Sequence, residues 1–222
     1  MNKRKQIAGT IRLAVLLTAI LGASCLCRSQ SRAAKESEVY CKTEDGRAWM
    51  EIVRDSDDYY LIGHIRNTVE SIADTLLYSH EMMGTYVKGL YALDAEDGST
   101  RYLFIYSKGR IFFYDEAVVY IAGKDGTVRR GLFRVNDTHM EDVGVMWWDA
   151  RVDACEGFPP DLVGYPDCDR DGIRFDSATR RLYVPVMDDF GPESEFSGCP
   201  IYTGHFSVLE FDGLEFVYIG DD

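Results

Sequence analysis

The fold is decided by a stretch in the middle of the chain, which reads Tyr114-Asp115-Glu116-Ala117-Val118-Val119-Tyr120-Ile121-Ala122-Gly123-Lys124-Asp125-Gly126-Thr127. Aromatic and β-branched residues fill its first part, and such residues are enriched in β-strands. The Asp125-Gly126 pair that follows supplies the positive φ angles of a tight hairpin turn. The stretch therefore predicts a strand over 110–122, a turn, and an antiparallel partner strand over 127–135.

The same pattern extends outward in both directions. Similar runs predict strands at 48–53, 59–65, 86–94, 101–107, 143–151, 181–188, 204–211 and 214–219. Asp212-Gly213 predicts another hairpin turn between the last two of these strands. We expect a mainly β fold with antiparallel sheets, arranged as a sandwich or as a partial propeller. A propeller usually has four or more blades of four strands, and about ten strands are too few for that, which favours the sandwich.

One segment departs from the β pattern and predicts a single helix near 68–83. Asn67, with Glu70 three residues later, fits a capping box, and Gly84 stands where a helix often ends. The apolar or edge residues between them recur at steps of three and four, which places them on one helix face. They are Val69, Ile72, Ala73, Leu76, Leu77, His80 and Met83.

The N-terminus has the three zones of an export signal. Basic residues come first, an apolar run extends from Leu13 to Leu21, and small residues stand just before Cys25. The apolar run is shorter than the roughly 20 residues that cross a bilayer. We therefore expect residues 1–24 to be a signal peptide that is removed.

The end of this segment, Leu21-Gly22-Ala23-Ser24-Cys25, resembles the lipobox of bacterial lipoproteins. The resemblance implies that Cys25 becomes the first mature residue and carries acyl chains such as palmitate. Several acyl chains anchor a protein stably to a membrane, at about 0.8 kcal/mol per buried methylene. The implied location is the cell envelope, at the outer membrane facing the periplasm or the cell surface. Gly22 departs from the usual aliphatic residue and Cys27 lies nearby, so a plain secretory signal remains an alternative.

Charge and length limit the partners and the number of domains. Removing the signal takes four of the 24 Lys and Arg, which leaves 20 against 37 Asp and Glu and a formal charge of −17. Such a surface repels nucleic acid, which we do not expect as a partner. Residues 28–38 are polar and lack apolar periodicity, so we expect residues 25–40 to form a lipidated tether. Residues 41–222 predict a single β-rich domain, because they are too few to form two domains that each have a large apolar core.

Four cysteines remain for the folded part, and they are Cys41, Cys155, Cys168 and Cys199. In an oxidising compartment four thiols predict two disulfides, and the sequence leaves all three connectivities open. Cys155 and Cys168 are the first choice for a pair, because they flank a loop rich in glycine and proline. Closing a loop of about 14 residues contributes roughly 3 kcal/mol. The spacing contains no CxxC pair and does not indicate a zinc site.

The segment Asp167-Cys168-Asp169-Arg170-Asp171-Gly172 has the spacing of a calcium loop. Its alternate carboxylates, Asp167, Asp169 and Asp171, can converge on one hard cation, and glycine permits the sharp turn. Asp176 is a candidate for a later ligand. Ala178 stands where an EF-hand loop has its bidentate glutamate, which favours an ordinary acidic surface turn. Calcium is the cofactor that the alternative, a metal-binding loop, implies.

Trp147 and Trp148 are a candidate ligand platform, because aromatic faces stack on sugar rings. Adjacent side chains of a strand point to opposite faces, so we expect one of the two in the core. A glycan-cleaving site needs two carboxyl groups about 5 to 10 Å apart, a distance that the sequence does not give. The candidate carboxyl groups for such a site form an acidic cluster at the end of the strand predicted over 181–188, and they are Asp188, Asp189, Glu193 and Glu195.

Known catalytic signatures are missing from the sequence. His80-Glu81-Met82-Met83-Gly84 has glycine where a zinc-protease helix needs its second histidine. There is no nucleophile elbow, no phosphate-binding glycine loop and no dinucleotide fingerprint.

Two C-terminal segments, 172–186 and 204–218, resemble small, uncharacterised lipoproteins typical of the Bacteroidetes. They read Gly-Ile-Arg-Phe-Asp-Ser-Ala-Thr-Arg-Arg-Leu-Tyr-Val-Pro-Val and Gly-His-Phe-Ser-Val-Leu-Glu-Phe-Asp-Gly-Leu-Glu-Phe-Val-Tyr. They also resemble the hairpin of a β-propeller blade. Neither resemblance implies a reaction.

The function indicated is that of a non-catalytic envelope lipoprotein that binds a ligand or partner, protein or glycan, through loops of a β domain. Two alternatives stay open. One is an envelope hydrolase that uses acidic residues within 167–195. The other is an acidic immunity or inhibitor protein that blocks a basic toxin or enzyme.

Overall fold

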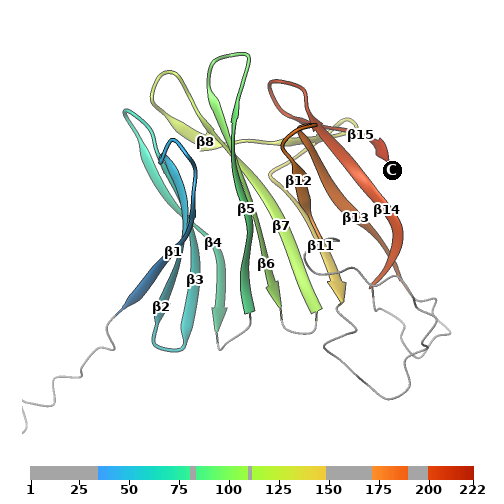
Figure 1. Cartoon of the computed structure of the whole chain (residues 1–222), viewed down its shortest axis with the longest axis horizontal. Coiled ribbons are helices and arrows are strands. Elements are labelled where there is room, and N and C mark those ends of the chain that lie inside the picture. The colour runs from blue at the N-terminus through green and yellow to red at the C-terminus, as the bar shows by residue number, and fades with distance from the viewer. Residues whose placement is uncertain (1–34, 81–83, 110–111, 149–171, 190–199) are drawn as a thin grey trace, which may run out of the picture. The chain divides into compact units, whose positions relative to one another are not determined.

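Three β-sheets make up the part of the chain that the computed structural model describes, namely residues 35–80, 84–109, 112–148, 172–189 and 200–222 (Figure 1). The first sheet has the order β1 (Glu36–Lys42), β2 (Ala48–Asp55), β3 (Asp58–Arg66) and β4 (Ser71–His80). The middle sheet has the order β11 (Asp142–Trp148), β7 (Phe112–Ala122), β6 (Thr100–Gly109) and β5 (Gly84–Asp94), and β8 (Val128–Arg130) also pairs with β7. The third sheet has the order β10 (Thr138–Met140), β9 (Phe133–Val135), β15 (Phe216–Asp221), β14 (Pro200–Phe211), β13 (Arg181–Asp189) and β12 (Arg174–Asp176).

The strand pairing confirms the predicted mainly β class with antiparallel sheets. Among the described residues every strand pair is antiparallel except β9 with β15, which run parallel. Glu36–Asp222 form one compact unit. Strand β1 begins at Glu36, within the segment 25–40 that the sequence predicts as a tether.

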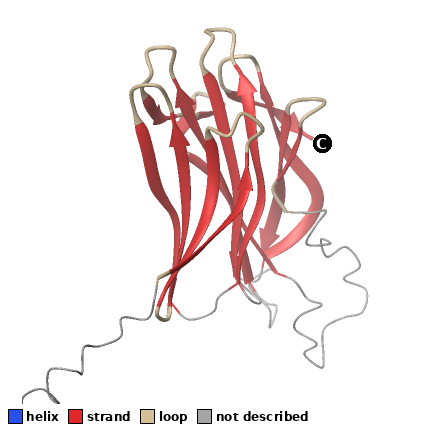
Figure 2. Ribbon diagram, turned by 60° about the vertical axis from the view of Figure 1, so that its left-hand side comes forward, coloured by secondary structure: helices blue, strands red, loops and turns tan. Residues whose placement is uncertain are grey.

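The middle sheet is buried on both faces. Tyr102, Phe104 and Tyr106 of β6 pack against the first sheet, whereas Leu103 and Ile105 pack against the third. Successive side chains of a strand point to opposite faces, so a strand covered on both sides reads as an unbroken apolar run. The middle sheet therefore lies between the other two, as both views show (Figures 1 and 2).

Two apolar cores hold the sheets together, since each fully buried large side chain contributes about 1.5–3 kcal/mol. The core between the first and middle sheets is formed mainly by Ala48, Met50, Leu61, Ile65, Leu77, Tyr102, Phe104, Tyr106, Val118, Tyr120, Ala122 and Val128. The core between the middle and third sheets is formed mainly by Leu93, Leu103, Ile105, Ala117, Val119, Phe133, Val143, Val145, Ile173, Phe175, Leu182, Leu209, Phe211 and Phe216.

The prediction of a helix near 68–83 is wrong, because the described residues of this segment contain strand β4. Ser71–His80 pairs antiparallel with β3, and residues 81–83 lie outside the described residues. The register shifts at Leu76, where a β-bulge turns both Leu76 and Leu77 toward the core. A bulge interrupts the two-residue alternation of a strand. Ile72, Leu76 and Leu77 then recur at the spacing that a helix would have.

The two residues predicted to cap that helix instead hold a neighbouring turn. Asn67 donates from Nδ2 to the backbone oxygens of Gly123 and Thr127, at 2.8 and 3.0 Å. Glu70 accepts a hydrogen bond from the backbone N–H of Val128 through Oε2, at 2.7 Å. These contacts join the turn between β3 and β4 to the turn between β7 and β8.

The strand predicted over 127–135 is split into β8 and β9, which belong to different sheets. Gly131 stands at the break, where its backbone N–H still donates to the oxygen of Val119 at 2.8 Å. Two residues later Phe133 is completely buried in the core of the third sheet. The chain thus crosses from the middle to the third sheet over Gly131 and Leu132.

One end of the stacked sheets carries the turns that join β1 to β2, β3 to β4, β5 to β6, β7 to β8, β12 to β13 and β14 to β15 (Figure 1, top). We call it the turn end. Both predicted Asp-Gly turns lie here and are confirmed, and both glycines have positive φ angles. Asp125 accepts a hydrogen bond from the N–H of Thr127 at 3.1 Å, and Asp212 accepts one from the N–H of Leu214 at 2.9 Å.

Candidate functional site

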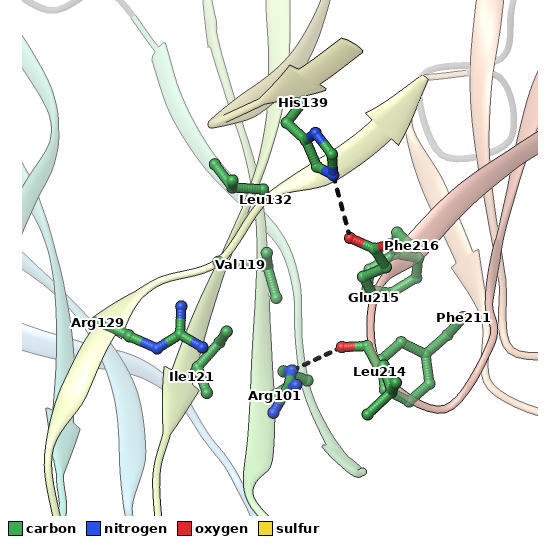
Figure 3. A pocket seen from close by; sticks show the side chains of 11 residues that line it. Arg101, Val119, Ile121, Arg129, Leu132, His139, Phe211, Leu214, Glu215 and Phe216 are labelled. Carbon is green, nitrogen blue, oxygen red and sulfur yellow. Dashed lines mark hydrogen bonds and ion pairs between the residues drawn. The ribbon is translucent and has the colours of Figure 1, made fainter. Parts of the chain in front are cut away.

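An open pocket of about 360 Å³ lies at the turn end, between the middle and third sheets (Figure 3). We call it the inter-sheet pocket. Its volume is within the range of about 300–1,000 Å³ that is common for small-molecule sites. Its apolar lining consists of Val119, Ile121, Leu132, Phe211, Leu214 and Phe216. Its polar lining consists of Arg101, Arg129, His139 and Glu215, and Gly131 completes it.

The crossover between the sheets forms one wall of the pocket. Gly131 lies so close to β7 that an added Cβ would stand 2.6 Å from Cγ1 of Val119. Glycine thus lets the chain turn away from β7 without displacing the apolar floor. The next residue, Leu132, remains 40% exposed, and Leu214 on the facing turn is 45% exposed. Two large apolar side chains therefore stand in water at the pocket, while Phe211 and Phe216 beneath them are buried.

Arg101 joins the two sheets beneath the pocket. Its side chain is almost fully buried, and it donates from Nε to the backbone oxygen of Leu214 at 2.9 Å. It also donates to the hydroxyl of Ser99 and, from a terminal nitrogen, to Asp97 at 3.1 Å. Hydrogen bonds from Ser99, and then from Arg101, hold the pKa of Asp97 well below its usual range. The guanidinium of Arg101 is therefore committed to the protein itself.

Glu215 is likewise engaged by neighbouring cations. Its Oε1 lies 3.1 Å from Nε of Arg134, and its Oε2 lies 3.7 Å from Nε2 of His139. Arg134 also lies 3.7 Å from Asp212. These groups bring β9, β10 and the β14–β15 turn together on one side of the pocket, where Figure 3 shows His139 facing Glu215.

Arg129 differs from the other charged groups of the pocket, because within the described residues it makes no hydrogen bond or ion pair. It lies opposite Ile121 in the β7–β8 pairing, and its side chain stands beside Ile121 in the wall (Figure 3). Its charge is the smallest of several causes that lower the pKa of Asp125, of which the hydrogen bond from the side chain of Thr127 is the first. A guanidinium on an apolar wall is thus available to an anion.

A second polar cluster lies between the first and middle sheets. Arg130 donates to Oη of Tyr120 at 2.6 Å and lies 3.3 Å from Asp74, to which Tyr120 also donates. Nearby, burial raises the pKa of Glu116, which accepts a hydrogen bond from the buried Tyr106. Burial and the bond to Glu116 in turn raise the pKa of Tyr106. Through these contacts the cluster links β4, β6, β7 and β8.

Most residues that the sequence singled out lie outside the described residues. They are Cys25, Cys155, Cys168, Cys199, Asp167, Asp169, Asp171, Glu193 and Glu195. Trp147 and Trp148 end strand β11, where their backbones pair with Phe113 and Phe112, but their side chains are not described. Asp188 and Asp189 end strand β13, and their side chains are likewise not described.

Two of the predicted site residues can be placed. Cys41 lies on β1 as a free, half-buried thiol whose pKa is raised by burial. A disulfide from Cys41 is therefore not seen, and the pairing stays a prediction. Asp176 caps its own turn, because its carboxylate accepts hydrogen bonds from the N–H of Ala178 at 2.9 Å and from Oγ1 of Thr179 at 2.7 Å. The hydrogen bond from the Thr179 hydroxyl, followed by that from Ala178, lowers its pKa.

Among the residues that the structure describes, no three histidine, cysteine or carboxylate side chains gather closely enough to hold a metal ion. Asp176 is the one member of the predicted calcium site that can be seen, and its hydrogen bonds go to its own turn. Calcium binding at 167–171 accordingly remains a prediction.

Sequence patterns did not reveal the inter-sheet pocket, because its polar residues are far apart along the chain. Arg101, Arg129, His139 and Glu215 come from β6, β8, β10 and the β14–β15 turn. The one local signal is Gly131, since an isolated glycine inside a strand pattern often marks a bulge or a close approach of two backbones.

The described part of the chain has no helix that is long and apolar enough to span a bilayer. None of the protein families, curated proteins and solved structures that were compared with this chain matches it.

Proposed function

We propose that this chain is a non-catalytic cell-envelope lipoprotein, held at a membrane through Cys25, which binds a ligand or partner at the turn end of its β domain. The observation that carries the proposal is the inter-sheet pocket, with Leu132 and Leu214 exposed beside it. Exposed apolar side chains that gather at a concave site are a common feature of binding surfaces. A ligand seated there would remove both from water.

The turns around the pocket support this proposal, because hydrogen bonds fix them in advance. Asp97 accepts from the N–H of Ser99 at 2.9 Å, and Asp212 accepts from the N–H groups of Leu214 and Glu215, both at 2.9 Å. A site that is ordered before binding loses less conformational entropy when the ligand arrives. The turn end therefore offers a preformed surface.

The sheet arrangement that we infer is a three-layer sandwich. Both faces of the middle sheet are covered, and the cores on its two sides share no residue. A propeller usually has four or more blades. The pocket lies between the middle and third layers of this sandwich, beside the crossover at Gly131 and Leu132 that joins the two sheets.

The proposal is tested by thermal unfolding of the full mature chain in detergent, with panels of peptides, glycans and small organic acids. We expect one panel to raise the melting temperature in a saturable way, because a ligand that binds only the folded state stabilises it by mass action. Leu132→Asp should abolish the shift. Val39→Asp, at an exposed apolar residue on β1, should leave it unchanged.

Two results would contradict the proposal. The first is the absence of any saturable shift with all panels. The second is a shift that survives Leu132→Asp in a variant that is still folded, since the ligand would then bind elsewhere.

A further inference from the structure

The inter-sheet pocket has a chemical character that narrows its ligand, and this step rests on the proposed function. Its walls are apolar, with Val119 and Ile121 on one side and Phe211 and Phe216 on the other. The volume of about 360 Å³ is near the lower end of the range for small-molecule sites. The body of the ligand should therefore be small and apolar.

Except for one, the charges that line the pocket are held in ion pairs. Arg101 is paired with Asp97, and Glu215 lies between Arg134 and His139. Arg129 is the guanidinium that has no hydrogen bond or ion pair within the described part of the chain. The pocket thus presents one available positive charge on a chain whose formal charge is −13.

A guanidinium matches the two oxygens of a carboxylate through parallel N–H···O bonds. One uncompensated cation balances a singly charged carboxylate, whereas a phosphate monoester would bring close to two negative charges into an acidic protein. We propose that the inter-sheet pocket binds a small carboxylate with an apolar body, whose carboxylate pairs with Arg129 and whose body packs between Leu132 and Leu214.

Isothermal titration of the full mature chain in detergent tests this with matched probes. Phenylacetate carries the expected body and charge, phenylacetamide has the same shape without the charge, and acetate has the charge without the body. We expect phenylacetate to bind about tenfold or more tightly than either, because a hydrogen bond to a charged group contributes about 1.5–3 kcal/mol. Inorganic phosphate should compete weakly.

The variants assign the effect to Arg129. Arg129→Gln should weaken phenylacetate about tenfold or more and leave phenylacetamide unchanged, whereas Arg129→Lys should retain part of the affinity. The matched control is Arg54→Gln. Arg54 is an exposed arginine on β2 of the first sheet, and it lies near the end of that strand that points away from the turn end. Its affinities should equal those of the unaltered protein. The unfolding midpoint of each variant shows that it is folded.

The outcomes separate this inference from the proposed function. Equal binding of phenylacetate and phenylacetamide, unchanged binding in Arg129→Gln, or tighter binding of phosphate would overturn the carboxylate assignment. If carboxylates fail while a peptide or glycan still gives a shift that depends on Leu132, the ligand class is wrong and the binding function stands. If nothing binds, both are wrong.

Discussion

The Nε of Arg101 donates a hydrogen bond to the backbone oxygen of Leu214 at 2.9 Å, and this bond ties the middle sheet to the β14–β15 turn of the third sheet. The guanidinium is almost fully buried and also holds Asp97. It thereby fixes the turn that carries Leu214 against the inter-sheet pocket. The bond connects the stability of the domain with the shape of the candidate site.

Replacing Arg101 should therefore lower both stability and binding. Arg101→Met removes the side-chain donor to the oxygen of Leu214 and one of the donors to the carboxylate of Asp97, and we expect a loss of about 2–3 kcal/mol in the free energy of unfolding. Urea unfolding measures it. The control is Arg54→Met, because Arg54 is an exposed arginine that lies over the ring of Tyr59. This variant should lose about 1 kcal/mol or less in the free energy of unfolding. Equal losses for the two variants would show that the buried bond has no special weight.

The close packing around Gly172 predicts a large effect of a single methyl group. A Cβ at this position would overlap Nζ of Lys88 and Oδ2 of Asp115, which form an ion pair. Asp115 is fully buried and also accepts from the N–H of Ile173 at 2.9 Å. Gly172→Ala must displace one of these charged groups, so we expect a loss of about 3 kcal/mol or more in the free energy of unfolding.

The control for this variant is Gly204→Ala. A Cβ at Gly204 meets no atom within 4 Å, although its φ angle of +89° is unfavourable for alanine. Its loss should be about 1 kcal/mol, from backbone strain alone. The interpretation fails if Gly204→Ala is the more destabilising of the two in urea unfolding.

Glu116 should make the domain less stable as the pH rises. Burial raises the pKa of its carboxyl, so the folded chain binds its proton more tightly than the unfolded chain does. The free energy of unfolding then falls as the pH rises from the unfolded pKa, about 4.3, through the higher folded pKa. Glu116→Gln should remove this fall. The free energy of unfolding of the variant should therefore rise relative to that of the unaltered protein between about pH 4 and pH 7. Glu44→Gln, at an exposed residue, should follow the unaltered protein, and a parallel curve for Glu116→Gln would contradict the argument.

Asp125 should contribute in the opposite direction. Hydrogen bonds from the side chain and then the backbone of Thr127 lower the pKa of its carboxyl. The stability that it contributes is present above the unfolded pKa of about 3.9 and is lost as the pH falls through the lower folded pKa. Asp125→Asn should therefore melt earlier than the unaltered protein at neutral pH, and the difference should shrink below about pH 4. Melting curves that differ equally at every pH would speak against this.

The cysteines can be tested by peptide mapping of mature protein from an oxidising compartment. We expect a cross-linked peptide that joins Cys155 to Cys168. The second predicted bond, between Cys41 and Cys199, requires that Cys41 is not the free thiol of the structure. Four unmodified cysteines among these residues would exclude both disulfides.

The sequence alone determined the elements whose signals are local. The strands around 101–107 and 110–122 were predictable because aromatic and β-branched residues fill them. The turns at Asp125-Gly126 and Asp212-Gly213 were predictable because few other residue pairs adopt their backbone angles. The segment Ser71–His80 misled the prediction, because the bulge at Leu76 imitates a helical spacing.

Only the tertiary structure decided how the sheets stack and what they enclose. The sequence does not say that the chain leaves the middle sheet at Gly131, or that Arg101 reaches Leu214. Arg129 and His139 become neighbours of the β14–β15 turn only after the third sheet has packed onto the middle one. The physical reason is range: strand propensity and turn geometry act over a few residues, whereas burial and pairing between sheets join residues that are distant along the chain.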